Sequence, residues 1–244
     1  MSISSVPPLL LTPNSLFANI FMQDGPKLPR FNGILINTFD GIETEAVELL
    51  NGGKVIEALP PLFTVGPLVP CEFEKVDDDQ LGNAQLLKWL DDQAEGSVVY
   101  VSFGSRTALS RDQIKELGDG LVRCGFRFLW VVKEKLVDRE EEEVVEAAWY
   151  GVRILAWPQN GDQKLNAEVV ERSGLGIWAR TWAWTGDDPV VVVKGEDIAV
   201  KIKELMQSEE LRVKALKIRE EAKRVAGCRE KIFKGLIEEW SKNT

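Results

Sequence analysis

Residues 97–132 read SVVYVSFGSRTALSRDQIKELGDGLVRCGFRFLWVV, and this stretch decides the fold class. Its first and last seven residues are apolar runs rich in branched and aromatic side chains, which is typical of buried strands. Between them, Ser110 followed three residues later by Gln113 is a capping-box pattern that opens a helix, and Gly125 stops it. Strand, helix and strand at this spacing predict a βαβ unit, and hence a parallel sheet with a right-handed crossover.

Towards the N-terminus the same signals continue. GILINT at 33–38 predicts a short buried strand, and DGIETEAVELL at 40–50 predicts an amphipathic helix. The segment 60–70 is apolar and bounded by prolines, so we expect it to be extended. Five prolines interrupt residues 1–30, and we expect these residues to be irregular.

Towards the C-terminus, strands are predicted at 152–158 and 174–178, with a helix over 164–172 between them. VVVV at 190–193 fits either an edge strand or an extended connection. From Glu196 onward the apolar spacing predicts amphipathic helices almost to the end. Strands that alternate with helices indicate an α/β fold.

Composition excludes several classes of function. The 244 residues allow one large domain or two small ones, and the net charge of −9 argues against a nucleic-acid partner. No apolar run approaches the roughly 18 residues of a membrane helix, and the N-terminus lacks a basic signal region. Cys71, Cys124 and Cys228 are few and widely spaced, which favours reduced thiols. We therefore expect a cytoplasmic protein with no membrane partner.

The chain contains no histidine. This removes the commonest general base and any Ser-His or Cys-His catalytic pair within the chain. A zinc site is also not expected, because no second cluster of ligands accompanies the scattered cysteines.

Three polar positions fall where a parallel sheet presents the carboxyl ends of its strands, which is where ligands bind in such folds. Gly104-Ser105 follows the first strand of the βαβ unit and can approach a phosphate, although a plain turn is an equal alternative. Glu146 can accept paired ribose hydroxyls, although its place after four other glutamates favours an ordinary solvated residue. Asp162-Gln163 suits the vicinal diol of a hexose, although a helix cap explains the aspartate as well.

SVVYVSFGS, RFLWVV and above all VVEAAWYGVRILAWPQNGDQKLNAEVVERSGLGIW (144–178) resemble the C-terminal domain of plant UDP-glycosyltransferases. GILINTFDGIE and LPPLFTVGPLVP resemble the end of the N-terminal domain of that family and the start of its interdomain linker. WLDDQ, the βαβ stretch and WAWTGDDPVVVVKGEDIA are most similar to the subgroup that includes flavonoid C-glucosyltransferases.

The resemblance implies a GT-B-like fold, with a Rossmann-type parallel sheet in the C-terminal lobe and a remnant of the N-terminal lobe. Residues 1–70 correspond to that acceptor-binding remnant and 71–96 to the linker. Residues 97–225 correspond to the donor-binding lobe, and 226–244 to a helix that returns to the first lobe.

The resemblance also assigns roles to the candidate residues. Ser105 corresponds to the serine near the diphosphate, Glu146 to the glutamate that holds the ribose hydroxyls, and Asp162 and Gln163 to the pair that binds the sugar hydroxyls. It implies inverting transfer of glucose from UDP-glucose, the donor substrate, to a small phenolic acceptor such as a flavonoid. No metal and no cofactor are expected, and the protein is expected to be a monomer.

Two departures from the family accompany the resemblance. The catalytic histidine of the family lies in the N-terminal lobe and has no counterpart here, so no catalytic residue is assigned. Two strands and a His-Cys-Gly-Trp-Asn-Ser run of the family are missing near 143/144. One missing strand would pair beside SVVYVSF, so we expect unpaired ladder groups at about 1–3 kcal/mol each and a poorly folded or rearranged sheet. The alternatives are an inactive remnant that binds UDP-sugar weakly or binds another protein, and a fragment that pairs with a separate N-terminal chain.

Overall fold

A computed structural model describes residues 6–68, 81–104, 107–132, 143–159, 161–182 and 191–242. The chain forms two compact units. Unit 1 comprises Met1–Val69, Glu142–Arg180 and Glu209–Thr244, and unit 2 comprises Pro70–Glu141 and Thr181–Ser208. Residues 97–225, expected to form one donor-binding lobe, thus contribute to both units. Part of the expected linker 71–96 lies outside the described residues.

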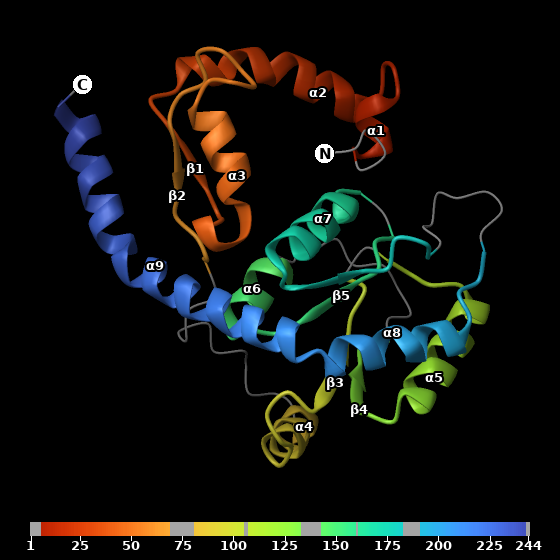
Figure 1. The fold of residues 1–244 in the computed structure, drawn as a ribbon. Coiled ribbons are helices and arrows are strands. Elements are labelled where there is room, and N and C mark those ends of the chain that lie inside the picture. The colour runs from red at the N-terminus through yellow and green to blue at the C-terminus, as the bar shows by residue number, and fades with distance from the viewer. Residues whose placement is uncertain are drawn as a thin grey trace. The chain divides into compact units, whose positions relative to one another are not determined.

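Unit 2 contains the predicted βαβ unit. Strands β3 (Val98–Val101) and β4 (Arg127–Trp130) are parallel neighbours on either side of α5 (Arg111–Cys124) in the sequence. Ser110 caps α5 by accepting a hydrogen bond from the Gln113 N–H at 3.2 Å, and Gly125 ends the helix with φ +78°. Helices α4 (Leu81–Asp91) and α8 (Gly195–Gln207) complete the unit, and α8 lies along α5 (Figure 1).

The predicted burial of these two strands is wrong. No residue of β3 or β4 is fully buried, and Tyr100 is 61% and Phe128 38% exposed. The reason lies in the sheet: within the described residues, β3 has β4 as its only strand neighbour. A two-stranded sheet leaves one edge of each strand unpaired, so an apolar sequence does not guarantee a covered strand.

Unit 1 contains two further parallel pairs. Strand β1 (Ile34–Ile36) pairs with β2 (Leu62–Thr64), and β5 (Ile154–Ala156) pairs with β6 (Gly176–Trp178). Around them lie helices of widely separated sequence: α3 (Asp40–Asn51), α6 (Glu143–Tyr150), α7 (Gln163–Ser173) and α9 (Glu209–Lys242).

The core of unit 1 joins these helices. Figure 1 shows α9 passing beside α6, and the two helices are in contact. The buried cluster takes one or more side chains from α3, α6, α9 and the loop before β6: Phe39, Ile42, Ala148, Leu175, Ala215, Ile218 and Ala222. Residues far apart in sequence therefore share one core, which holds the β5–α7 region in place.

The expectation of an irregular N-terminus is wrong for much of its length. Short helix α1 (Pro8–Leu11), helix α2 (Leu16–Asp24) and the 3-10 helix η2 (Gly25–Arg30) follow one another. Ser15 caps α2 by accepting a hydrogen bond from the Ala18 N–H at 3.0 Å, so a local cap outweighs the prolines around it. No helix in the described ranges is both long and apolar enough to cross a bilayer.

Candidate functional site

The loop between β5 and α7 carries the predicted Asp162-Gln163 pair. Asp162 occupies the N-cap position of α7 with φ −91° and ψ 0°, but its side chain makes no capping hydrogen bond. The side chain is exposed. Just before it, Gly161 has φ +60°, a conformation that favours glycine. The helix-cap interpretation therefore explains the position of Asp162 but not its carboxylate, which is left available to a ligand.

Gln163 is placed differently from its neighbour. It is the first residue of α7 and is half-buried, and its Oε1 accepts a hydrogen bond from the Gln159 N–H at 2.7 Å. Gln159 itself is only 5% exposed, and its Nε2 donates to the Trp157 carbonyl at 3.4 Å. Gln159 is not among the site residues predicted from the sequence. Its only signal is its position, four residues before Gln163 and directly after Pro158.

No described contact links Glu146 or Ser105 to this loop. Glu146 lies on α6 with an exposed side chain, and it makes no hydrogen bond or ion pair within the described part of the chain. Ser105 lies outside the described residues. Their roles at the ribose and the diphosphate therefore stay predictions.

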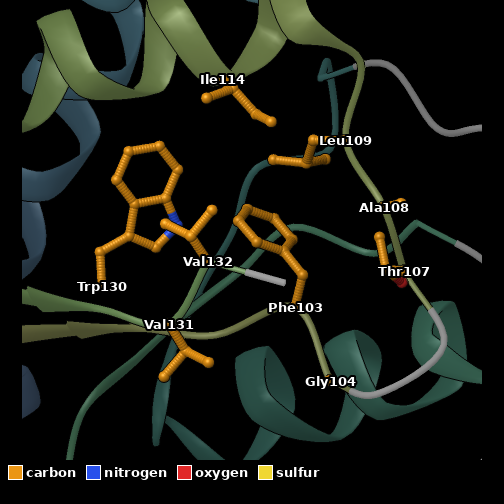
Figure 2. Close-up of a pocket in the computed structure, with 9 residues that line it drawn as sticks. All are labelled: Phe103, Gly104, Thr107, Ala108, Leu109, Ile114, Trp130, Val131 and Val132. Carbon is orange, nitrogen blue, oxygen red and sulfur yellow. The ribbon is translucent and has the colours of Figure 1, made fainter. Parts of the chain in front are cut away.

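A second candidate position is the carboxyl end of the β3–β4 pair in unit 2, next to Gly104. Figure 2 shows Phe103, Trp130 and Val132 turned towards one another, with Leu109 and Ile114 beside them. The cavity that they line together with Gly104, Thr107, Ala108 and Val131 measures about 30 Å³. That volume suits about one water molecule, whereas small-molecule sites usually measure about 300–1,000 Å³. The described residues therefore enclose too little space at this position for a nucleotide.

No protein-family profile matches the chain. Individual proteins do. The chain is 45% identical over 291 aligned positions to UDP-glycosyltransferase 708G2 of Citrus unshiu, covering 99% of this chain and 61% of the relative. It is 43% identical to UDP-glycosyltransferase 708D1 of Glycine max, and that alignment covers 98% of this chain and 61% of the relative. This chain is a homologue of the plant UDP-glycosyltransferases.

Solved structures of UDP-glycosyltransferases have the same fold as this chain. LpCGTa in complex with UDP superposes with a TM-score of 0.80 at 36% identity, covering 99% of this chain and 62% of that chain. UGT2 of Phytolacca americana, complexed with UDP-2fluoro-glucose and pterostilbene, superposes with a TM-score of 0.77 at 25% identity. The superposition covers 98% of this chain and 61% of that chain. The α/β fold with parallel strands expected from the UDP-glycosyltransferase resemblance is thereby confirmed.

This UDP-glycosyltransferase homologue spans about 61% of the length of the curated relatives it matches. The alignment with the Citrus protein is also longer than the chain itself, since 291 positions against 244 residues leave at least 47 without a residue here. The length of the alignment does not locate these positions, so the loss of a segment near 143/144 stays a prediction.

Proposed function

We propose that this chain carries the sugar-recognising part of a UDP-sugar donor site. The reaction that we propose for this member of the family is the inverting transfer of glucose from UDP-glucose to a small phenolic acceptor such as a flavonoid. The single observation that carries the proposal is the Asp162-Gln163 pair at the start of α7, in which the Asp162 carboxylate is exposed and not used as a helix cap. In support, relatives named UDP-glycosyltransferases match nearly the whole chain.

The chemistry of the pair fits a hexose. The Asp162 carboxylate only accepts hydrogen bonds, so it pairs with a sugar hydroxyl that donates. The Gln163 amide both donates and accepts, so it can serve a neighbouring hydroxyl. Bonds to an ionised carboxylate are stronger than neutral ones, which makes Asp162 the stronger anchor of the two.

The remaining donor contacts in this proposal come from Glu146 at the ribose and Ser105 at the diphosphate. UDP-glucose is the donor substrate, and we assign no metal ligand and no cofactor. The similarity to a structure that contains UDP-2fluoro-glucose and pterostilbene supports a UDP-sugar and a phenolic compound as the two substrates.

A second candidate function is UDP-sugar binding without transfer. One observation favours it for the 244-residue chain taken alone: the sequence contains no histidine to act as a base. In this case the chain binds UDP-glucose weakly and forms no glucoside.

Titration calorimetry with UDP-glucose and with UDP tests the proposal on the purified chain. Because Asp162 is assigned to the sugar, Asp162→Ala should weaken UDP-glucose binding about tenfold while leaving UDP binding unchanged. Equal weakening of both ligands, or no UDP-glucose binding by the unsubstituted chain, would contradict the assigned donor site.

Incubation with UDP-glucose and a dihydrochalcone or flavonoid then separates the two candidates. Mass spectrometry of the products should show no glucoside if the chain only binds. A glucoside that forms with the unsubstituted chain and not with Asp162→Ala would establish transfer and rule out the second candidate.

A further inference from the structure

We infer that the main-chain N–H of Gln159 is a positioning group that fixes the Gln163 carboxamide beside Asp162 before any donor arrives. The inference rests on the proposed function and adds to it a residue that the resemblance does not name. Gln159 is not a catalytic residue, because it acts through Gln163.

The contact is short and sheltered. The 2.7 Å between Gln159 N and Gln163 Oε1 lies at the short end of the range for N–H···O hydrogen bonds. Gln159 is buried and Gln163 half-buried, so water competes weakly for this bond. Because a main-chain N–H can only donate, it selects the oxygen end of the carboxamide and disfavours the flipped amide, which would place donor against donor.

Both ends of the loop are anchored independently. Strand β5 is held by β6 in the register Ala156↔Trp178. The first turn of α7 is held by the Asp162 carbonyl, which accepts from Leu165 N at 2.8 Å and from Asn166 N at 3.2 Å. The bond from Gln159, three residues beyond the end of β5, to Gln163, the first residue of α7, ties the loop to the helix. A side chain ordered in this way does not have to lose its freedom when ligand binds, and preorganisation of this kind raises affinity.

The orientation of the Gln163 carboxamide also distinguishes Gln163 from Asp162. With Oε1 turned to the Gln159 N–H, the Nε2 end of the amide points away from that contact, as the planar amide group requires. Gln163 Oε1 is thus engaged by the main chain, whereas the Asp162 carboxylate, which can only accept, makes no capping bond. The two side chains therefore differ in what they offer a ligand.

Hydrogen exchange of the unliganded chain, followed by NMR, tests the positioning contact directly. We expect the Gln159 amide to exchange at least about tenfold more slowly than in Gln163→Ala, because the substitution removes its acceptor. Asp162→Asn is the matched control and should leave the Gln159 rate unchanged. A Gln159 amide that exchanges as fast in the unsubstituted chain as in Gln163→Ala would overturn the inference.

A pair of substitutions at Gln159 tests the consequence for UDP-glucose binding. Gln159→Ala keeps the N–H and should change the affinity by less than about twofold, whereas Gln159→Pro removes it and should weaken binding about fivefold. Equal affinities for the two variants would overturn the inference and leave the donor site intact. If the unsubstituted chain does not bind UDP-glucose, the proposed function fails, and the exchange measurement still decides whether Gln159 positions Gln163.

Discussion

Gln113 and Val193 are joined by two hydrogen bonds although they lie 80 positions apart: Gln113 Nε2 donates to the Val193 carbonyl at 3.0 Å, and Val193 N–H donates to Gln113 Oε1 at 2.8 Å. Gln113 was expected to complete a capping box with Ser110. Only the Ser110 half of the box forms. The Gln113 side chain instead supplies the backbone of residue 193 with the partners that a neighbouring strand would otherwise give.

Replacing Gln113 by alanine should destabilise unit 2 by about 2 kcal/mol or more, because each buried backbone group left unpaired costs about 1–3 kcal/mol. Urea unfolding measures the loss, and the Val193 amide should exchange faster at the same time. Asp112→Ala is the control, since its exposed side chain pairs, among the described residues, with Lys115 alone at 3.6 Å; it should cost less than about 0.5 kcal/mol. An equal loss in both variants would contradict the role of Gln113.

Three glycines in and after α5 should respond to alanine in different ways. At Gly118 a Cβ meets only Trp130 Cζ3 at 3.9 Å, so Gly118→Ala should stabilise the helix by about 0.5–1 kcal/mol. At Gly120 a Cβ would lie 2.8 Å from Ile198 Cβ, so Gly120→Ala should force α5 and α8 apart and lower stability. At Gly125, with φ +78°, alanine should cost about 1 kcal/mol.

Thermal unfolding of the three variants under one condition measures these differences. The order of stability should be Gly118→Ala above the unsubstituted chain, with the other two below it. A stable Gly120→Ala variant would mean that α8 does not pack on α5 as described.

Glu116 should make unit 2 sensitive to acid. The Gly195 N–H at 2.8 Å and the Lys194 ammonium at 3.0 Å donate to its carboxylate. These contacts hold the pKa of the Glu116 carboxyl below its ordinary value of 4.5. Because the pKa is lower in the folded state, the stabilisation is present above pH 4.5 and is lost as the pH falls through the folded-state pKa.

The measurement is the melting temperature between pH 3 and pH 7 of the unsubstituted chain and of Glu116→Gln. The chain should melt at a higher temperature than the variant at pH 7, and the difference should shrink as the pH falls below about 4.5. A difference that stays constant over this range would show that the charge of Glu116 contributes nothing to stability.

Asp162→Ala should leave the fold intact. The carboxylate makes no capping bond, so we expect a change in unfolding free energy of less than about 0.5 kcal/mol. Ser110→Ala is the matched case of an N-cap that does bond, and it should cost about 1 kcal/mol. Chemical denaturation compares the two. If Asp162→Ala destabilised the chain as much as Ser110→Ala, the aspartate would be a structural cap rather than a ligand-binding residue.

Local signals in the sequence were sufficient for most of the helices and for the strand order around α5. Ser110 and Gly125 mark the ends of that helix because caps act within a few residues of themselves. The apolar runs on either side become β3 and β4, paired in parallel. The place of Asp162 and Gln163 after β5 and at the start of α7 also followed from the sequence, because an apolar run ends shortly before them and a helical pattern begins.

The tertiary structure decided what these elements touch. Gln113 bonds to Val193, Phe39 shares a core with Ala215, and Tyr100 is exposed on a strand whose residues suggested burial. It also decided that Gln163 is oriented by Gln159 N–H, while the carboxylate of Asp162 is left without a cap bond. The physical reason is range: a cap or a periodic apolar pattern depends on residues a few positions away. The covering of a strand and the partner of a buried amide depend on segments that the neighbouring sequence does not specify.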